Sequence, residues 1–368
     1  MTRVLMISKA LVVGIYQRKL EHIAESGVDL RVVVPPYWRD ERGKLPLERA
    51  YTDGYRLDVL PARLNGRFHL YFYAGLRRIM REFKPEIVHI DEEPYNVAAW
   101  QCLYHARRVK ARTVFFSWQN INRAYPFPFG AGESWFLRHV NHGIVGTDSA
   151  AQVWREKGYT GELTTIPQFG TDTDLFKPVQ EVHQRRERFV IGYVGRLVAE
   201  KGVDVLLRAV AGMSGDWELR ILGGGPARDD LKGLAEALGI GSRVKFLPQI
   251  PSTQIHTFYH DLSALALPSL TRPNWKEQFG RVLVEAMASG VPVVGSDSGA
   301  IPEVIGDAGL VTPEGDAEAL RGALMSVQND FTLAAHLSML GQERAAAHFT
   351  HRQIAAQTVA VYSALMAQ

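Results

Sequence analysis

The sequence is almost free of cysteine, since Cys102 is the only one among 368 residues. A single thiol cannot form an internal disulfide, so a disulfide-stabilised scaffold is excluded and a reducing compartment is expected. No apolar run approaches the ~18 residues that a membrane-spanning helix needs. The apolar N-terminal segment is interrupted by Lys9 and lacks a small-residue cleavage site, so we interpret it as a buried strand rather than a signal peptide.

A large net charge is also missing, because 42 Lys and Arg residues oppose 39 Asp and Glu residues and leave a formal charge of +3. So small an excess does not favour a nucleic acid as partner. The balance nevertheless differs along the chain. Residues 1–170 carry 24 basic and 17 acidic side chains, whereas residues 171–368 carry 18 and 22. A basic half and a mildly acidic half indicate two modules with different partners.

What the sequence does contain is a regular alternation of short apolar runs and helix-length amphipathic stretches. The runs are rich in β-branched residues and end at Gly, Pro or Asp, as strands do when both faces of a parallel sheet are buried. Repeated strand–helix units predict an α/β fold with doubly wound sheets. The runs lie at 3–7, 30–34, 56–60, 86–90, 112–116, 143–146, 189–195, 217–222, 243–247, 263–268, 291–296 and 309–312.

These runs form two series, and a stretch without apolar periodicity separates them at 168–189. The stretch contains turn residues, a proline and a charge run, which are typical of a linker between domains. Two domains also agree with the length of the chain, at about 150 residues per domain. We expect helices at 202–211, 226–238 and 279–289, and a further helix after Phe349.

Two cations follow the first predicted strand of the second series. Arg196 comes directly after the strand, and Lys201 lies five residues later at the start of a helix. Ligands of open α/β sheets bind beyond the carboxyl ends of the strands, and cations beside a helix N-terminus form an anion site. Two solvated surface cations would produce the same pattern. The glycines at 223–225, after the next strand, permit either close approach to a ligand or a tight turn.

Two glutamates accompany the predicted helix at 279–289. Glu277 stands at the predicted helix start, and Glu285 lies about two turns along the chain. Carboxylates this close to an anion site are favourable when hydroxyl groups are their partners, as in a ribose or a hexose. A solvated glutamate pair on an amphipathic helix is the simpler alternative. Backbone N–H groups expected to be free at this helix start belong to Phe279, Gly280 and Arg281.

These segments, in this order, resemble the donor-binding half of the retaining family-4 glycosyltransferases, the glycosyl transferases group 1. The resemblance rests on GRLVAEKG at 195–202, LGGGP at 222–226 and the two glutamates of 277–305. GTDTDLFKP at 170–178 also resembles the segment that joins the two domains of that family.

The resemblance implies the GT-B architecture, an α/β fold with two Rossmann-like doubly wound domains facing a central cleft. The acceptor-binding domain would comprise residues 1–168 plus the returning segment 350–368, and the donor-binding domain residues 169–349.

The resemblance further implies transfer of a sugar from a UDP- or GDP-sugar to an acceptor hydroxyl with anomeric retention. Arg196 and Lys201 would hold the diphosphate and stabilise its developing charge, so that no metal and no other cofactor is required. Glu277 would bind hydroxyls of the donor sugar, and Glu285 those of the ribose. The other implied donor contacts are Gly14, Gly195, Gly224, Pro248, Gln249, Ile250, Gln278, Phe279, Gly280, Arg281 and Val282.

The sequence departs from the family at one position. Many relatives have a histidine after a central strand of the first domain, where this chain has Ser117-Trp118-Gln119-Asn120. Gln119 or Asn120 would supply a neutral hydrogen bond, but neither side chain is a general base near pH 7. Same-face substitution, in which the leaving phosphate takes the acceptor proton, needs no such base. Tyr16 and Glu93, on loops that follow predicted strands, are further candidates for contacts with the sugar or acceptor.

The acceptor is expected to be a carbohydrate, a lipid-linked sugar or a small molecule, as in the synthesis of polysaccharides, glycolipids or glycoconjugates. Residues 62–84 combine six basic residues with Phe68, Tyr71 and Phe72. On a helix, such residues favour an anionic membrane surface, although a core-facing helix with a charged outer face explains them equally. We expect a cytoplasmic protein, either free in the cytoplasm or peripheral at the inner face of the membrane.

Two other functions stay open at this point. A sugar-nucleotide epimerase can share the two-domain fold, although the spaced glutamates favour transfer. A nucleotide-sugar-binding protein with little turnover is the second, because the histidine of the family is missing.

Overall fold

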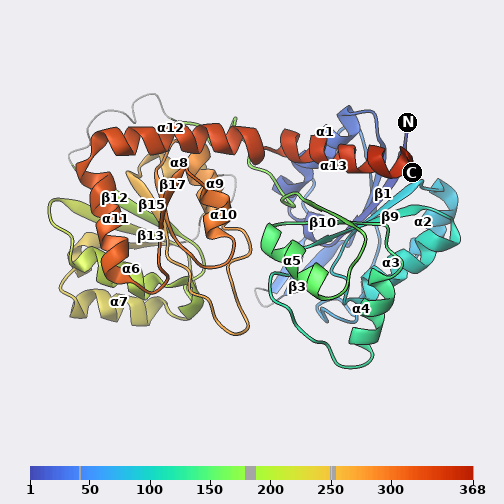
Figure 1. Cartoon of the computed structure of the whole chain (residues 1–368), viewed down its shortest axis with the longest axis horizontal. Helices are drawn as coiled ribbons and strands as arrows, with labels where there is room; N and C mark the ends of the chain where they lie inside the picture. The colour runs from blue at the N-terminus through green and yellow to red at the C-terminus, as the bar shows by residue number, and fades with distance from the viewer. Residues whose placement is uncertain (41–42, 179–187, 249, 251–253, 368) are drawn as a thin grey trace. The chain divides into compact units, whose positions relative to one another are not determined.

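The computed structural model describes residues 1–40, 43–178, 188–248, 250 and 254–367. It divides the chain into two compact units (Figure 1). Unit 1 comprises Met1–Gly170 and His351–Gln368, and unit 2 comprises Thr171–Thr350. The corresponding boundaries in the sequence analysis are 168/169 and 349/350.

The described part of unit 1 contains a sheet of seven parallel strands in the order β11-β10-β9-β8-β1-β2-β5. The strands are β1 (Arg3–Ser8), β2 (Asp29–Val34), β5 (Arg56–Val59), β8 (Ile87–Asp91), β9 (Arg112–Ser117), β10 (His142–Val145) and β11 (Glu162–Thr165). Six of them confirm the predicted runs. The sequence analysis missed β11, because this edge strand is not fully buried and contains no continuous apolar run.

Both faces of this sheet are covered, as the apolar runs predict. Along β1, Val4 and Met6 belong to one core cluster, whereas Leu5 and Ile7 belong to another. Successive side chains of a strand point to opposite faces, so a run that is apolar at every position needs a core on each side. The covering helices are α1 (Arg18–Glu25), α2 (Leu76–Phe83), α3 (Val97–Arg108), α4 (Phe129–Leu137), α5 (Asp148–Glu156) and α13 (His351–Ala367).

The C-terminal helix α13 belongs to unit 1 although unit 2 precedes it in the chain. It packs against α1 (Figure 1), and its buried Tyr362 hydroxyl forms a hydrogen bond of 2.6 Å with His89 Nδ1 on β8. Burial lowers the pKa of His89 to about 4, so this imidazole is neutral at physiological pH. The helix is therefore anchored to the centre of the unit 1 sheet by a specific polar contact as well as by apolar packing.

The expectation of a basic helix across 62–84 is wrong for most of that range. Only α2 is helical, and the hairpin of β6 (Ala62–Arg63) and β7 (Phe72–Tyr73) precedes it. Gly66 and Gly75 have φ angles of 91° and 89°, which interrupt a right-handed helix. The helix α2 buries Leu76, Ile79 and Met80 and exposes its arginines, as the core-facing alternative predicts.

The described part of unit 2 contains a sheet of six parallel strands in the order β14-β13-β12-β15-β16-β17. They are β12 (Phe189–Val194), β13 (Trp217–Leu222), β14 (Val244–Leu247), β15 (Ala264–Leu267), β16 (Val293–Ser296) and β17 (Gly309–Thr312), and all six confirm predicted runs. The helices include α6 (Val203–Ala211), α7 (Arg228–Ala237), α8 (His256–His260), α9 (Arg281–Ala288), α10 (Ile301–Ile305), α11 (Ala317–Asn329) and α12 (Phe331–His348). Short η elements comprise η1 (Ala10–Val12) and η2 (Gly14–Gln17) in unit 1, and η3 (Ala199–Lys201) and η4 (Gly241–Arg243) in unit 2.

The predicted linker at 168–189 is partly incorporated into the two units. Gln168 is buried in unit 1, where its Nε2 donates to Asp91 Oδ1 at 2.7 Å. Phe176 is buried in the core of unit 2, a role that its polar neighbours conceal in the sequence. Residues 179–187 lie outside the described part of the chain.

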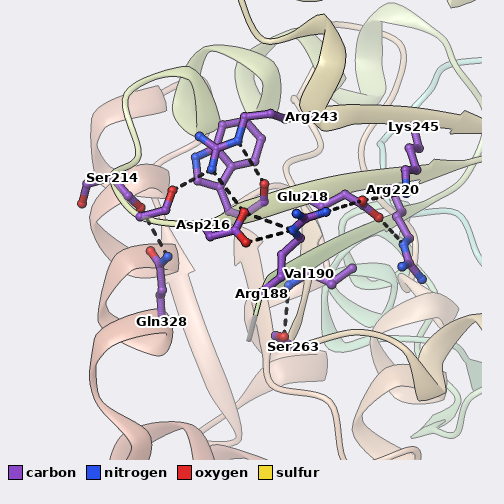
Figure 2. A network of polar contacts seen from close by, with 12 residues as sticks. Arg188, Val190, Ser214, Asp216, Glu218, Arg220, Arg243, Lys245, Ser263 and Gln328 are labelled. Atoms are coloured by element: carbon purple, nitrogen blue, oxygen red, sulfur yellow. Dashed lines mark hydrogen bonds and ion pairs between the residues drawn. The ribbon is translucent and has the colours of Figure 1, made fainter. Parts of the chain in front are cut away.

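An ion-pair network lies at the amino-terminal edge of the unit 2 sheet (Figure 2). Glu218, near the start of β13, accepts from Arg220 Nε at 2.7 Å and is 2.7 Å from Lys245 Nζ. Arg188, just before β12, donates to Asp216 at 3.0 Å and reaches Glu218 at 3.4 Å. Burial raises the pKa of Glu218, but hydrogen bonds from Lys245 and Arg220 outweigh this effect and bring its pKa below the ordinary value.

Arg243 completes the network from η4. Its guanidinium donates to the carbonyl oxygens of Gly215 at 2.6 Å and Trp217 at 3.2 Å, and lies 4.1 Å from the Trp217 ring centre (Figure 2). The network thus joins the starts of adjacent strands at the edge of the sheet where open α/β folds do not bind ligands.

Candidate functional site

At the carboxyl edge of unit 2, the chain turns sharply after β12 and presents two cations. The Arg196 side chain is 47% exposed, and its Nη2 is 4.0 Å from Glu200 Oε1. Lys201 is mostly buried, and its Nζ donates to Glu277 Oε2 at 2.5 Å. The Lys201 ammonium also lies 4.8 Å from the centre of the Trp275 ring. The structure therefore brings together two of the predicted site residues, Lys201 and Glu277, which are 76 positions apart.

Gly202 explains how Lys201 reaches this position. Its φ is 63°, and a Cβ atom here would lie 1.9 Å from the carbonyl oxygen of Pro268. Only glycine permits both the left-handed backbone and the close approach to the chain after β15. The helix α6 begins immediately afterwards at Val203.

Glu277 occupies a different place from the predicted one. The helix α9 begins at Arg281 rather than 279, after Gly280 with a φ of 79°, so Glu277 lies on the loop before the helix. Of the three residues expected to present N–H groups in the first helical turn, only Arg281 belongs to the helix. The difference arises because Gly280 takes a left-handed conformation, which separates the extended loop from the helix.

Neighbouring loops position Glu277 firmly. The Ser269 hydroxyl donates to Glu277 Oε2 at 2.8 Å, and the Ala300 N–H donates to the Glu277 carbonyl oxygen at 3.1 Å. A Cβ atom on Gly299 would be only 2.1 Å from that same oxygen. The loops after β15 and β16 therefore hold both the backbone and the carboxylate of Glu277.

Glu285 lies on α9 with its side chain buried. The Tyr259 hydroxyl donates to Glu285 Oε2 at 2.7 Å, and Arg281 Nε lies 3.0 Å from Oε1. Burial raises the pKa of Tyr259 well above its ordinary value, and the Glu285 charge adds to the effect, so Tyr259 remains a donor. The sequence analysis missed Tyr259, whose position after a polar turn was the only signal.

The glycines after β13 serve mainly to pack two strand ends together. Added Cβ atoms would lie 2.0 Å from the Gly195 carbonyl oxygen at Gly223 and 2.3 Å from the Leu197 carbonyl oxygen at Gly225. Close packing against the segment that follows β12 therefore accounts for these two residues. Gly224 differs, since a Cβ atom there would meet nothing within 4 Å. Its backbone is the part of the loop that a ligand can approach.

Arg228, at the start of α7, is a residue that the sequence analysis did not identify. Its Nη1 donates to the Gly223 carbonyl oxygen at 3.0 Å, and its Nη2 donates to that of Phe246 at 3.0 Å. It therefore ties the glycine loop to the end of β14, which directly precedes in the chain the three implied donor contacts Pro248, Gln249 and Ile250. Of these, Pro248 is exposed, Ile250 packs against the core, and Gln249 lies outside the described residues.

The remaining donor candidates flank Gly280. Gln278 is exposed, whereas Phe279 and Val282 are half-buried against the unit 2 core. The Phe279 ring lies 5.6 Å from that of Phe349. Gln278 is therefore the more accessible of these side chains.

In unit 1, two residues predicted at the site have partners within their own unit. The Gly14 N–H donates to Glu48 Oε2 at 2.7 Å, so a carboxylate holds the amide that the resemblance assigns to a phosphate. Tyr16 stacks on Phe169 with ring centres 3.8 Å apart and planes at 6°.

Glu93 contacts the segment that stands in place of the family histidine. It accepts from the Ser117 hydroxyl at 2.6 Å and from the Trp118 N–H at 3.0 Å. Burial raises the pKa of Glu93 to about 7, although both hydrogen bonds act in the opposite direction. Gln119 and Asn120 are both buried, and Gln119 Nε2 donates to the Ile121 carbonyl oxygen at 3.0 Å.

Unit 1 has its own lysine–glutamate pair, which the sequence analysis missed. Lys9, just after β1, donates from Nζ to Glu92 Oε2 at 2.5 Å, as Lys201 after β12 does to Glu277. Glu92 is completely buried and also accepts from the hydroxyls of Tyr71 and Tyr73. With donors on both oxygens, Glu92 is a structural group of the core.

Within the described ranges, no three His, Cys, Asp or Glu side chains are grouped as metal ligands. None of the described helices is long and apolar enough to cross a membrane.

Two family models match the chain. The model of the glycosyl transferases group 1 matches residues 177–344, and that of the glycosyl transferase 4-like domain matches residues 15–168. A GDP-mannose-dependent alpha-(1-6)-phosphatidylinositol monomannoside mannosyltransferase of Mycolicibacterium smegmatis is 34% identical over 199 residues, 50% of this chain and 52% of the relative. A D-inositol 3-phosphate glycosyltransferase of Mycobacterium marinum is 35% identical over 320 residues, which cover 78% of this chain and 66% of the relative. The matches thus span between half and two thirds of these relatives.

Solved structures share the architecture of the whole chain. Sucrose-phosphate synthase from Thermosynechococcus elongatus has a TM-score of 0.76 at 22% identity and covers 100% of both chains. Anabaena HepE in complex with UDP has a TM-score of 0.74 at 18% identity and covers 99% of this chain and 100% of its own. At these identities, the likeness shows the fold alone.

Proposed function

The chain belongs to the glycosyl transferases group 1 and has the GT-B fold, and we propose that it transfers a sugar from a nucleotide diphosphate sugar to an acceptor hydroxyl. The observation that carries the proposal is the contact of Lys201 with Glu277 at the carboxyl edge of unit 2, beside the half-exposed Arg196. A cation and a carboxylate side by side match a ligand that combines phosphate charge with hydroxyl groups.

In this proposal, Arg196 and Lys201 bind the diphosphate and stabilise the negative charge that grows as it leaves. Preorganised cations at the position of developing charge are often the largest single contribution to catalysis. Gly202 and Trp275 hold Lys201 in place before the substrate arrives. Because side-chain cations neutralise the diphosphate, the proposed reaction proceeds without a metal.

The two glutamates bind hydroxyl groups of the donor. Glu277 would accept from the donor sugar, and Ser269 and Lys201 would keep its carboxylate oriented. Glu285 would accept from the ribose, since each carboxylate oxygen can take a second hydrogen bond beside those of Tyr259 and Arg281. The partly exposed Gly224 and the exposed Pro248 would border the rest of the nucleotide.

We propose retention by same-face substitution. The bond from the anomeric carbon to the diphosphate oxygen breaks, and the acceptor oxygen bonds to that carbon on the same face. The acceptor proton moves to the departing phosphate oxygen, which balances the charge. This route is consistent with Gln119 and Asn120, neither of which can accept a proton near pH 7.

The donor is a UDP- or GDP-sugar. One relative at 34% identity depends on GDP-mannose, whereas a fold neighbour was solved with UDP. The acceptors named for the two relatives, a phosphatidylinositol monomannoside and an inositol phosphate, favour a carbohydrate or cyclic polyol, free or lipid-linked. The proposed role is in polysaccharide, glycolipid or glycoconjugate synthesis.

A lipid-linked acceptor is supported by the surface of unit 1 around the β6–β7 hairpin. Leu64, Leu70 and Phe72 are exposed there, which is unusual for large apolar side chains so close in sequence. Arg77, Arg78 and Arg81 line a surface cavity of about 640 Å³ nearby in the chain. Apolar side chains followed by arginines suit an anionic membrane surface.

Vesicle sedimentation tests this partner. Vesicles with anionic lipids should retain the protein and neutral vesicles should not, and Arg77→Ala/Arg78→Ala/Arg81→Ala should release it. Equal retention by both vesicle types would contradict the proposal.

The activity is tested in two steps. A thermal-shift screen of UDP, GDP and their sugars identifies the donor, because a bound ligand raises the unfolding temperature. The selected donor is then incubated with a panel of sugars, inositols and lipid-linked sugars, and NMR of the product gives its anomeric configuration. Epimerisation of the donor without an acceptor would contradict transfer. Binding without transfer to any acceptor would favour a nucleotide-sugar-binding protein.

A further inference from the structure

Four aromatic side chains gather on loops at the carboxyl edge of the unit 1 sheet. Tyr95, shortly after β8, stacks on Tyr125 of the loop after β9, with ring centres 4.5 Å apart. His69 lies 5.5 Å from Tyr95 and 5.7 Å from Tyr125, and Phe68 lies 6.2 Å from Tyr95. We name these four residues the aromatic cluster. Three separate loops contribute to it, so only the fold brings them together.

The aromatic cluster is only partly covered. Phe68 is 40% exposed, and the other three side chains are half-buried. The buried Nδ1 of His69 has no hydrogen-bond partner within the described part of the chain. A buried polar atom without a partner is costly, and a hydroxyl group of a bound ligand would remove this cost.

Glu93 lies beside the aromatic cluster. It precedes Tyr95 by two residues on the loop between β8 and α3. Burial raises the pKa of Tyr95, and the charge of Glu93 adds to this effect. The Ser117 hydroxyl and the Trp118 N–H each donate one hydrogen bond to the Glu93 carboxyl, one to each oxygen. A half-buried carboxyl thus stands next to aromatic rings, at the edge of the sheet where open α/β folds bind ligands.

We propose that Glu93 and the aromatic cluster form the acceptor subsite, and that the group bound there is a sugar ring or a cyclic polyol. This inference rests on the proposed transferase function and assigns the second substrate to named residues. The C–H face of such a ring packs on aromatic rings, and its hydroxyls bond to a carboxyl. Phe68 and Tyr125 supply the apolar contact, and Glu93 supplies the hydrogen bond.

Electrostatics favours this ligand over the nucleotide. A diphosphate beside Glu93 would be repelled by its carboxylate form and by the nearby charge of Asp91, and the nearby cation Lys9 is already paired with Glu92. A neutral ring with several hydroxyl groups meets no such cost. The acceptor's own hydroxyls are therefore better partners for this part of unit 1 than any phosphate group.

The loop that carries Tyr125 is held in place. Lys157 Nζ donates to the Arg123 carbonyl oxygen at 2.7 Å and to Glu133 Oε2 at 2.8 Å, and lies 5.1 Å from the Tyr125 ring centre. The Lys157 and Glu133 side chains are both nearly buried. A platform fixed before binding loses less entropy when the ligand arrives.

The main test uses the full chain with its donor and an accepted sugar or polyol. Tyr125→Leu should raise the KM for the acceptor about tenfold, while the affinity for the nucleotide, measured by calorimetry, stays unchanged. Phe127→Leu is the matched control, because Phe127 is on the same loop but 88% exposed, and it should behave as wild type. An unchanged acceptor KM in Tyr125→Leu, or a loss of nucleotide affinity instead, would overturn the proposal.

Glu93→Gln provides a second, independent variant. It should raise the acceptor KM, and it should lack the change in acceptor affinity that we expect of the wild type between about pH 6 and 8, around the raised pKa of Glu93. The charged or titratable groups around Glu93 are Lys9, Asp91, Tyr95 and Tyr125, and all four remain in the variant. A wild-type pH profile in Glu93→Gln would contradict the assignment.

Failure of the proposed function looks different from failure of this inference. If wild-type protein transfers to no acceptor, the transferase proposal fails. Ligand-observed NMR with monosaccharides and inositol, comparing wild type with Tyr125→Leu, then still tests the subsite. Equal signals from the two proteins, with unfolding temperatures also equal, would overturn it.

Discussion

Both edges of the unit 2 sheet carry ion pairs of lysine or arginine with glutamate, but different parts of the fold position these side chains at each edge. At the amino edge, Glu218 contacts Arg220, Lys245 and Arg188, which lie on the strands or directly before them (Figure 2). At the carboxyl edge, Lys201 and Glu277 come from loops after different strands, and Arg196 is directed to a half-exposed position.

The difference lies in what positions the charges. Glycines with close backbone contacts, Gly202 and Gly299, hold the carboxyl-edge loops, whereas the central amino-edge charges, those of Glu218, Arg220 and Lys245, lie on strands β13 and β14. Glycine has no side chain of its own to contribute, so it serves to bring functional side chains from separate loops together. We therefore take an ion pair as a sign of a binding site when its two residues come from separate loops and a ligand can reach them.

The largest contrast is expected between two lysines. Lys201→Ala should lower kcat/KM by roughly 100-fold, about 2.7 kcal/mol, because a preorganised cation is lost from the leaving group. Lys245→Ala is the matched control, since Lys245 also pairs with a buried glutamate, and it should retain activity. Steady-state kinetics with the identified donor decides this. Equal losses in both variants would remove the functional distinction between the edges.

Next in size is the contrast between two buried glutamates. Glu285→Ala should weaken nucleotide binding about tenfold, or ~1.4 kcal/mol, because the ribose loses a charged acceptor. Glu218→Ala should leave that affinity unchanged and lower the unfolding temperature instead, since it leaves Arg220 and Lys245 without their shared carboxylate. Calorimetric titration and thermal unfolding of both variants separate the two effects. An unaltered affinity in Glu285→Ala would contradict the ribose contact.

A smaller contrast is expected between two arginines that bond to carbonyl oxygens. Arg228→Met should reduce nucleotide affinity about fivefold, because the glycine loop loses its connection to the end of β14, with a change of ~1 kcal/mol. Arg243→Met breaks equivalent bonds at the amino edge and should affect stability only. An equal fall of nucleotide affinity in both variants would contradict the prediction that only Arg228 positions the nucleotide-binding loop.

The smallest expected effect concerns acid stability. The pKa of Glu218 is lower in the folded chain than its ordinary value, so its ionised form stabilises the fold. This contribution is complete above the ordinary pKa of about 4.3 and is lost as the pH falls through the lower folded value. Glu218→Gln should therefore flatten the stability profile below about pH 4, as measured by denaturant unfolding. An identical acid limb in wild type and variant would refute this.

Local pattern was sufficient for most of the architecture. Twelve apolar runs were identified as strands because strands buried on both faces leave a continuous signal in the chain. The edge strand β11 and the short antiparallel pairs β3 (Tyr37–Asp40)–β4 (Gly43–Pro46) and β6–β7 leave no such signal, because their sequences contain no long apolar run. None of the residues of β4, β6 and β11 is fully buried. The helix expected across 62–84 was wrong because two left-handed glycines divide it.

The candidate site was predictable in its residue types but not in its contacts. Arg196, Lys201, Glu277 and Glu285 were identified from short motifs. The partners of the last three, Trp275, Ser269 and Tyr259, were not, because each belongs to a loop or helix other than that of the residue it contacts or carries no motif of its own. Arg228, which holds the glycine loop, was not identified either. A contact between two loops depends on the order of the strands in the sheet. It produces no hydrophobic periodicity in the sequence of either loop.

Periodicity and motif order alone established a two-series α/β chain with its cations and carboxylates near strand ends. This follows because a parallel sheet that is buried on both faces needs an apolar residue at nearly every position of each strand. The folded chain alone determined that Glu277 meets Lys201, that a carboxylate holds Gly14, and that Glu93 stands beside the aromatic cluster. Those pairings join residues far apart in sequence, and the packing of loops against one another decides them.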